Sequence, residues 1–268
     1  MTPSRLLFAS AAAALSLSSS AFPNARNFAY TYESAVLPAG RHELEFWTTW
    51  RNGRAGLYSR FDQRVEFEVG VTDRLLSAYY LNWHRVTEEI FPGYDLTTAD
   101  FDGVSSEWKY KLSDPTADAL GFALYGEATA NTDELELELK LIADKTVGPA
   151  LVAYNAVLEP EAELAGRSLE VEEVKMEHVL AASFPFGPGF AAGAEIRQPS
   201  VLVEGALEHA TLFAGPVLHF ASGEFWITAS ALFQLRALKR PAGSPPGRKL
   251  DLDEFERVNA RLLVSLPF

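Results

Sequence analysis

The most regular feature of the chain is an alternation of apolar and polar residues with a period of two. Across residues 134–141 every second position is Leu, and every position between is charged. Along residues 60–71, Phe and Val residues share one parity, and Arg, Asp and Glu residues share the other. A helix would scatter these apolar residues around its circumference, whereas a strand places them on one face. The alternation therefore predicts amphipathic β-strands.

The same alternation recurs along most of the chain. Strands are predicted near residues 41–52, 57–71, 74–86, 104–113, 119–130, 133–145, 149–159, 170–185, 189–198, 208–221, 224–236 and 256–268. Their number is even, as a single-chain bacterial barrel requires if both termini are to lie in the periplasm. The predicted fold is all-β: one closed antiparallel transmembrane β-barrel of about 12 strands, formed by residues 41–268.

The links between these strands are of two alternating kinds. Tight turns with Gly, Pro or Asp at the tip are predicted at residues 72–73, 113–115, 147–149, 186–188 and 222–223. Longer links are predicted at residues 87–103, 160–169, 199–207 and 237–255, with shorter ones at 52–56 and 131–132. Short periplasmic turns and longer external loops are typical of outer-membrane barrels. At Glu172–Glu173 the apolar parity switches, which predicts a bulge or the point where a strand leaves the membrane.

The N-terminal region predicts export. Arg5 is followed by a short apolar run and then by Ser19, Ser20 and Ala21. This order predicts a signal peptide over residues 1–21, cleaved after Ala21. Residues 22–40 alternate too, and they are expected to form a periplasmic tail, an extra strand or a segment inside the lumen.

The C-terminal residues alternate in the same way and end on an aromatic residue. Val264, Leu266 and Phe268 share one apolar face. This resembles the C-terminal strand of Gram-negative outer-membrane proteins, which the outer-membrane assembly machinery recognises. The expected location is therefore the outer membrane of a Gram-negative bacterium, after Sec-type export.

Composition narrows the possible functions. After the N-terminal run, no stretch approaches the roughly 18–20 apolar residues that a spanning helix needs. The net charge of −13 argues against nucleic acid as a partner. The chain has no Cys and its His residues lack metal-ligand spacing, so neither a metal site nor a cofactor is predicted. Trp47, Trp50, Trp83 and Trp108 are expected at the membrane interfaces.

The faces predicted to line the lumen are strongly ionic. The lumen and selectivity candidates are Glu43, Glu45, Arg60, Arg64, Glu66, Glu68, Glu107, Lys109, Glu134, Glu136, Glu138, Lys140, Glu195, Arg197, Arg257 and Arg261. One hypothesis is a charged pore, a passive channel for small polar or amphipathic solutes. The alternative is a salt-bridged, plugged barrel that acts through its external loops, since about twelve strands lie between filled eight-stranded barrels and open porins.

Opposed charges within this set would create a transverse field. The strands near 133–145 and 41–52 contribute mostly acids, whereas Arg60, Arg64, Arg257 and Arg261 contribute bases near the closing seam. The field arises only if the two groups face each other across the lumen.

Two further features bear on other chemistries. His178 lies on the face predicted to meet lipid, as does the catalytic His of some barrel lipid hydrolases, but no His-Ser motif adjoins it, so no catalytic residue is predicted. A basic cluster on an external loop could contact lipopolysaccharide phosphates or be simply solvated; it comprises Arg236, Lys239, Arg240, Arg248 and Lys249. Outer-membrane lipid and lipopolysaccharide are thus expected partners.

Two segments, residues 37–46 and 66–73, carry a more specific likeness. With the overall layout, they loosely resemble a group of outer-membrane barrels assigned to transport in aromatic-degradation pathways. This resemblance implies a barrel transporter and no particular substrate.

Overall fold

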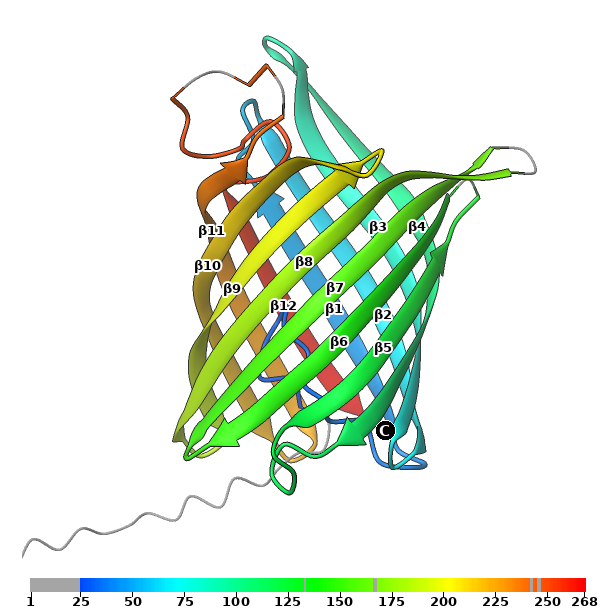
Figure 1. The fold of residues 1–268 in the computed structure, drawn as a ribbon, viewed down its shortest axis with the longest axis vertical. Coiled ribbons are helices and arrows are strands. Elements are labelled where there is room, and N and C mark those ends of the chain that lie inside the picture. Colours follow the sequence, from blue (N-terminus) through cyan, green and yellow to red (C-terminus); the bar gives the residue numbers. More distant parts are fainter. Residues whose placement is uncertain (1–24, 133, 166–167, 242, 245–246) are drawn as a thin grey trace, which may run out of the picture.

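The protein is a closed barrel of antiparallel strands. The computed structural model describes residues 25–132, 134–165, 168–241, 243–244 and 247–268. The strands are β1 (His42–Asn52), β2 (Tyr58–Thr72), β3 (Leu75–Phe91), β4 (Tyr94–Ser113), β5 (Gly121–Ala130), β6 (Glu134–Val147), β7 (Ala150–Ala165), β8 (Ser168–Gly187), β9 (Phe190–Val203), β10 (Ala206–Ser222), β11 (Phe225–Lys239) and β12 (Val258–Pro267). Each pairs with its sequence neighbours, and β1 pairs with β12 to close the ring (Figure 1). The predicted fold class is confirmed.

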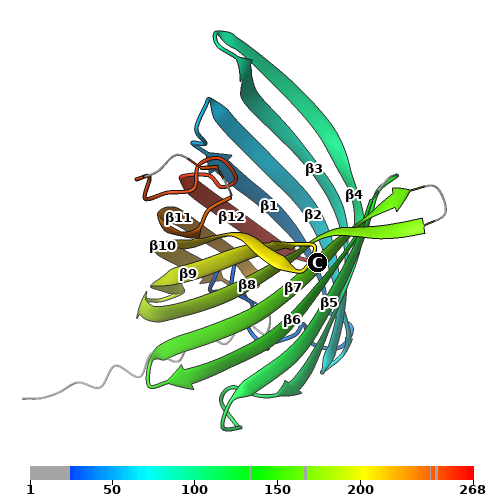
Figure 2. The same ribbon diagram turned by 45° about the horizontal axis from the view of Figure 1, so that its top comes forward.

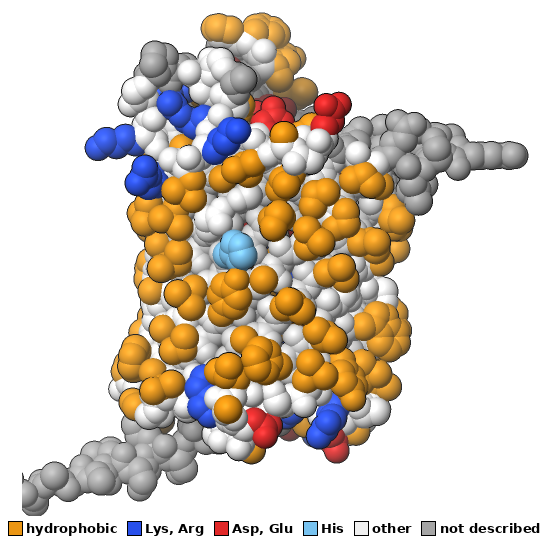
Figure 3. Space-filling model, viewed as in Figure 1, with side chains coloured by type: hydrophobic (Ala, Val, Ile, Leu, Met, Phe, Trp, Pro, Cys, Tyr) orange, Lys and Arg blue, Asp and Glu red, His pale blue; other side chains and the backbone are white. Residues whose placement is uncertain are grey.

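The two faces of each strand meet different surroundings, as the alternation predicted. On β6, Leu137, Leu139 and Leu141 point outward and are 43–62% exposed, whereas Lys140 between them is buried inside. The face of the outer surface seen in Figure 3 is largely hydrophobic between two ends that carry Lys, Arg, Asp and Glu side chains. Such an apolar band is the surface that lipid covers in transmembrane barrels. In the part of the chain that the structure describes, no helix is long and apolar enough to span a membrane.

The links at the end opposite the termini differ from the prediction. The segment 87–103 is not a loop, because β3 and β4 continue as a hairpin that turns at Pro92–Gly93 and rises beyond the rim (Figures 1 and 2). Segments 160–169 and 199–207 likewise fall mainly within paired strands. In the β3–β4 hairpin both faces are exposed, so backbone pairing continues where the apolar alternation stops. Between β11 and β12, by contrast, a long irregular link is present.

The parity switch near Glu172 coincides with a register irregularity. Glu161 of β7 pairs with Glu173 of β8, and the next pair is Ala162 with Val171. One residue of β8 is thus passed over, as in a β-bulge. The shift lets Glu173 and Val174 resume the alternation with the opposite parity.

The segment before β1 enters the barrel. Residues 25–37, here called the plug, run through the part of the lumen near the termini, seen in blue inside the barrel in Figure 1. Phe28, Ala29, Thr31 and Ser34 of the plug are completely buried. Just after the plug, the chain passes close to the wall at Gly70, where a Cβ atom would lie 2.0 Å from the Pro38 carbonyl oxygen. Glycine is required there because the backbone itself occupies the side-chain position. The predicted signal peptide, residues 1–21, lies outside the described residues.

Candidate functional site

The plug divides the lumen into two sections. The inner section lies toward the termini and is packed around the plug; the vestibule lies toward the opposite end and is open. In an outer-membrane barrel the termini face the periplasm, so the vestibule is the external section. Aromatic and aliphatic side chains from the wall pack around plug residues Ala29, Tyr30 and Tyr32. The lumen is therefore closed by packing at one end only.

One carboxylate holds the middle of the plug. Glu195 of β9 is completely buried and accepts hydrogen bonds from three successive backbone amides, those of Ala29 at 3.2 Å, Tyr30 at 2.8 Å and Thr31 at 2.9 Å. The Thr31 hydroxyl donates to the same carboxylate at 3.1 Å. Successive amides that converge on one anion form a strong, charge-assisted contact. Glu195 is thus the main polar anchor of the plug.

Side chains from other strands complete the seat. Asn155 of β7 accepts from the Tyr32 amide at 2.7 Å and donates to the Tyr32 carbonyl oxygen at 2.9 Å. Asp144 of β6 accepts from the Ser34 amide at 3.2 Å. These inward polar residues replace the hydrogen bonds that the irregular plug backbone cannot make with itself. The wall is therefore complementary to this particular path of the chain.

Cations surround the two plug tyrosines. The Arg197 and Arg261 guanidiniums lie 4.3 and 4.1 Å from the centre of the Tyr30 ring. Arg26 and Lys140 lie 3.9 and 4.0 Å from the centre of the Tyr32 ring. Burial raises the pKa of both tyrosines, so the phenols remain neutral and present their π-faces to the cations. The plug thereby places two neutral aromatic rings among these basic side chains.

Glu33 is the one carboxylate of the plug, and its pKa is shifted. Burial raises its pKa to about 7, although Asn27 donates to Glu33 Oε1 from its backbone at 2.8 Å and from its side chain at 3.2 Å. Glu33 therefore changes its protonation state near neutral pH when it is buried in the lumen.

The vestibule is a cavity of about 800 Å³. Tyr30 and Tyr32 of the plug and Trp47 of β1 contribute to its lining at the inner end. This volume is within the range of pockets that hold small molecules. The vestibule is thus large enough for a small solute but is closed at its base by the plug.

One wall of the vestibule is acidic. It is formed by β6, β7 and β8 and contains Glu134, Glu136, Glu138, Glu159, Glu161, Glu173 and Glu177. Lys175 lies among these acids, with its Nζ 2.5 Å from Glu161 and 3.4 Å from Glu159. Lys140 contacts Glu138 at 3.0 Å. These lysines compensate only part of the negative charge of the wall.

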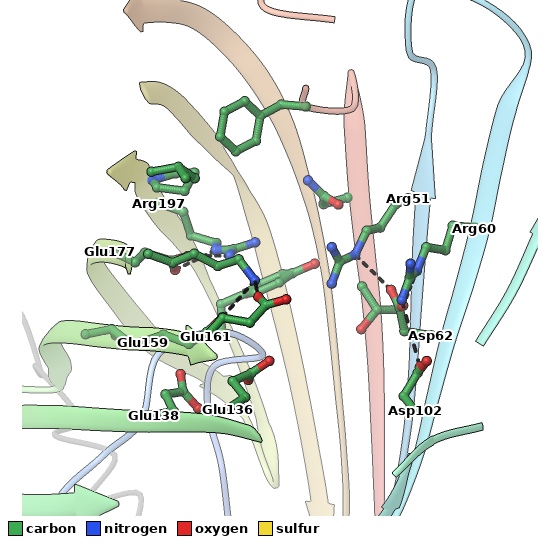
Figure 4. Close-up of a pocket in the computed structure, with 18 of the residues that line it drawn as sticks. Arg51, Arg60, Asp62, Asp102, Glu136, Glu138, Glu159, Glu161, Glu177 and Arg197 are labelled. Atoms are coloured by element: carbon green, nitrogen blue, oxygen red, sulfur yellow. Dashed lines mark hydrogen bonds and ion pairs between the residues drawn. The ribbon is translucent and has the colours of Figure 1, made fainter. Parts of the chain in front are cut away.

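The facing wall is rich in arginine. It is formed by β12, β1, β2 and the adjoining loop, and contains Arg51, Arg54, Arg60, Arg64 and Arg261. Asp62 bridges Arg51 at 2.8 Å and Arg60 at 2.5 Å, and so holds both guanidiniums in place. In a ring of twelve strands β7 lies opposite β1, so the two walls face each other, as Figure 4 shows. An arginine-rich wall thus faces a glutamate-rich wall across the vestibule, although Glu256, Asp102 and Glu127 pair with Arg54, Arg60 and Arg64.

The predicted lumen residues fall into three groups. Arg60, Arg64, Glu134, Glu136, Glu138, Lys140, Arg197 and Arg261 line the vestibule. Glu43, Glu45, Glu66, Glu68, Glu107, Lys109 and Glu195 are buried in the inner section. Arg257 is exposed beside the external loops, where it lines a small recess with Arg54, Arg248 and Lys249. The acids that face the arginines therefore do not include Glu43 and Glu45, because these lie too near the terminal end of β1.

Several site residues were not foreseen. Glu159, Glu161 and Lys175 line the vestibule, but the strand that carries the first two was predicted to stop at residue 159. Continued alternation across Pro160 would have placed Glu161 inside. Trp47 and Trp83 were expected at the membrane interface, yet they line the lumen. Trp47 has the same parity as the inward-facing Glu45, which indicates a position in the lumen. Trp83 has the same parity as the exposed Arg85, so the alternation gave no such indication for it.

His178 lies on the outer face of β8. Its Nδ1 is hydrogen-bonded at 2.7 Å to the hydroxyl of Tyr154, and the two rings stack. A nucleophilic site requires a Ser or Cys beside the His, and the hydrogen-bond partner found here is a phenol. Its geometry is that of an outward-facing aromatic pair.

Comparison with known proteins places the chain in a family. It belongs to the family of unknown function DUF6662, whose model matches residues 20–268. No functionally curated protein matches it.

Solved outer-membrane barrels share the fold at low sequence identity. The COG4313 outer membrane channel from Pseudomonas putida F1 aligns with a TM-score of 0.62 at 12% identity, over 87% of this chain and 97% of the channel. The beta domain of the Bordetella autotransporter BrkA aligns with a TM-score of 0.51 at 10% identity, over 86% of this chain and all of that domain. The chain therefore shares the fold of these outer-membrane barrels.

Proposed function

We propose that this protein is an outer-membrane channel for small dipolar solutes, with an external charge-separated vestibule and an N-terminal plug that must move for passage. The observation that carries the proposal is the placement of the glutamate wall of β6–β8 opposite the arginine wall of β12–β2 across about 800 Å³. A solute that bears both charges would orient between these walls, with its cationic group toward the glutamates.

The composition of the vestibule supports binding of polar rather than hydrophobic solutes. Charged side chains dominate its walls, whereas apolar contacts come mainly from Val157, Val179 and Phe213 and from the aromatic residues at the base. Small amphipathic solutes with an aromatic part could stack on Tyr30 or Trp47 while their charged groups contact the walls. This combination defines the proposed solute class.

The plug explains how such a channel would stay closed. Its contacts with the wall are side-chain packing, hydrogen bonds and cation–π pairs, rather than a continuous strand pairing. The plug can therefore leave as a unit without breaking the barrel ladder. The resemblance to the COG4313 channel supports a conducting role for the barrel itself.

Single-channel recording of refolded residues 22–268 in planar bilayers tests the proposal. We expect rare, brief conductance steps from the wild type and frequent steps once the plug is weakened by Glu195→Ala. The cysteine-free background allows Ala29→Cys to report plug exit by its reaction with a membrane-impermeant maleimide. If Ala29→Cys reacts fully in the Glu195→Ala background and no current flows, the barrel does not conduct and the external loops become the functional surface.

A further inference from the structure

A second group of acids lies in the inner section, away from the vestibule. Glu43 and Glu45 of β1 are directly opposite Glu68 and Glu66 of β2. With Glu107 of β4 they are all at most 4% exposed. Like charges opposite each other on neighbouring strands destabilise a sheet, and buried carboxylates need a compensating charge. Either bound protons or a cation must therefore offset this charge.

Neighbouring donors orient two of these carboxylates. Trp226 Nε1 donates to Glu43 Oε1 at 2.6 Å, and the Ser265 hydroxyl donates to the same oxygen. Trp47 Nε1 donates to Glu45 Oε2 at 2.9 Å. Each of these donors binds one oxygen of its carboxylate, which is how residues around a metal site hold the ligands in place.

Unpartnered oxygens point to a ligand. Glu45 Oε1 is buried and has no hydrogen-bond partner among the described residues. Glu66 lies opposite Glu45 on β2, and its Oε2 atom is also buried without a hydrogen-bond partner among the described residues. A buried acceptor without a donor costs free energy, so its persistence needs an explanation.

Three of the carboxylates are close enough to share one ion. Oxygen atoms of Glu43, Glu45 and Glu68 all lie within 4.8 Å of one another. Among the basic side chains, Arg26 of the plug interacts with Glu45, and Lys109 interacts with Glu68. Both also lie against the Tyr32 ring.

We propose that Glu43, Glu45 and Glu68 form a binding site for a divalent cation of the calcium type. Ca²⁺ binds carboxylate oxygens at about 2.3–2.6 Å, and three converging glutamates can supply such oxygens. The all-oxygen donor set disfavours softer metals that prefer nitrogen or sulfur. The ion would neutralise the inner section beside Arg26 and thereby stabilise the closed arrangement of plug and wall. The site does not depend on whether the barrel conducts.

Terbium luminescence tests the site, because Trp47 and Trp226 contact its ligands and would transfer excitation energy to Tb³⁺. Refolded residues 22–268 in detergent, freed of metal by a chelator, are titrated with Tb³⁺ under Trp excitation. We expect saturable binding of one ion per chain, displaced by Ca²⁺. Glu45→Gln and Glu68→Gln should each weaken binding at least tenfold.

The control is the double variant Glu136→Gln/Glu138→Gln, which removes two vestibule acids and should leave the terbium signal unchanged. Heat-modifiable migration in SDS gels verifies that each variant is folded. Absence of a saturable signal in the wild type overturns the proposal, whatever the variants do. An equal response in wild type, Glu45→Gln and Glu68→Gln overturns it as well, since the ion would then bind elsewhere.

Discussion

The inner section and the vestibule are built from the same strands and the same alternation, yet their charged residues have different roles. In the inner section a glutamate such as Glu195 is completely buried and is committed to the plug backbone. In the vestibule Glu136 and Arg60 line an open cavity that solvent or solute can reach. The comparison shows that an inward charge acquires its role from what fills the lumen beside it.

Substitution of Glu195, the anchor of the plug, should have the largest effect on plug exit. Glu195→Ala removes a buried acceptor of four hydrogen bonds, which should weaken the seat by about 3–5 kcal/mol. The unplugged population should rise more than about a hundredfold. The rate of maleimide labelling at Ala29→Cys measures this rise, and Glu136→Gln in the vestibule is the matched control. Equal labelling rates in both backgrounds would show that Glu195 is not the anchor.

Glu33 should make the plug pH-dependent. Its pKa is raised by burial from 4.5 to about 7, so the unseated form ionises first as pH rises. Below pH 4.5 the residue is protonated in both forms and the seat is at its strongest. Between pH 4.5 and 7 the seat should lose progressively up to about 3 kcal/mol.

Labelling at Ala29→Cys, normalised for the thiol's own reactivity with a denatured control, should therefore accelerate toward neutral pH. Glu33→Gln should flatten this profile. A profile that stays the same in Glu33→Gln would assign the pH dependence to other groups.

The vestibule acids should affect selectivity and not plug exit. Glu136→Gln/Glu138→Gln removes two negative charges from one wall, so the cation-to-anion permeability ratio should fall a few-fold. The reversal potential in a salt gradient, measured in the Glu195→Ala background, gives this ratio. Arg60→Gln on the facing wall should shift the potential in the opposite sense. Shifts of the same sign for both would contradict the opposed-wall arrangement.

A substitution on the lipid-facing exterior should have the smallest effect of those predicted here. Tyr154→Phe removes the hydroxyl that bonds His178 on the exterior, and stability should change by less than about 1 kcal/mol. Urea unfolding in vesicles measures the change, and neither conductance nor Ala29→Cys labelling should respond. A change in conductance would show that the exterior pair influences the lumen.

Much of this architecture could be predicted because it depends on local repetition. The Leu and Glu alternation of residues 134–141 specifies which face meets lipid without reference to any distant residue. The parity switch at Glu172–Glu173 marked the register irregularity for the same reason. The length of the β3–β4 hairpin was missed, since its solvated arms show no apolar alternation.

The candidate site was less accessible to prediction. Alternation places Glu45 and Glu138 on the same inner surface but does not state their height along the barrel. Height follows from strand tilt and stagger, which are properties of the closed ring. It separates Glu45, buried beside the plug, from Glu138, which lines the vestibule.

By itself, the sequence determined a membrane barrel with an apolar exterior and an ionic interior, because side-chain direction in a strand depends only on parity. The tertiary structure decided which charges are solvated and which are buried, and it placed the plug between them. The contacts that seat the plug join residues more than a hundred positions apart, such as Tyr32 with Asn155 and Tyr30 with Glu195. No local pattern records such a pairing, because it exists only once the ring has closed around the segment.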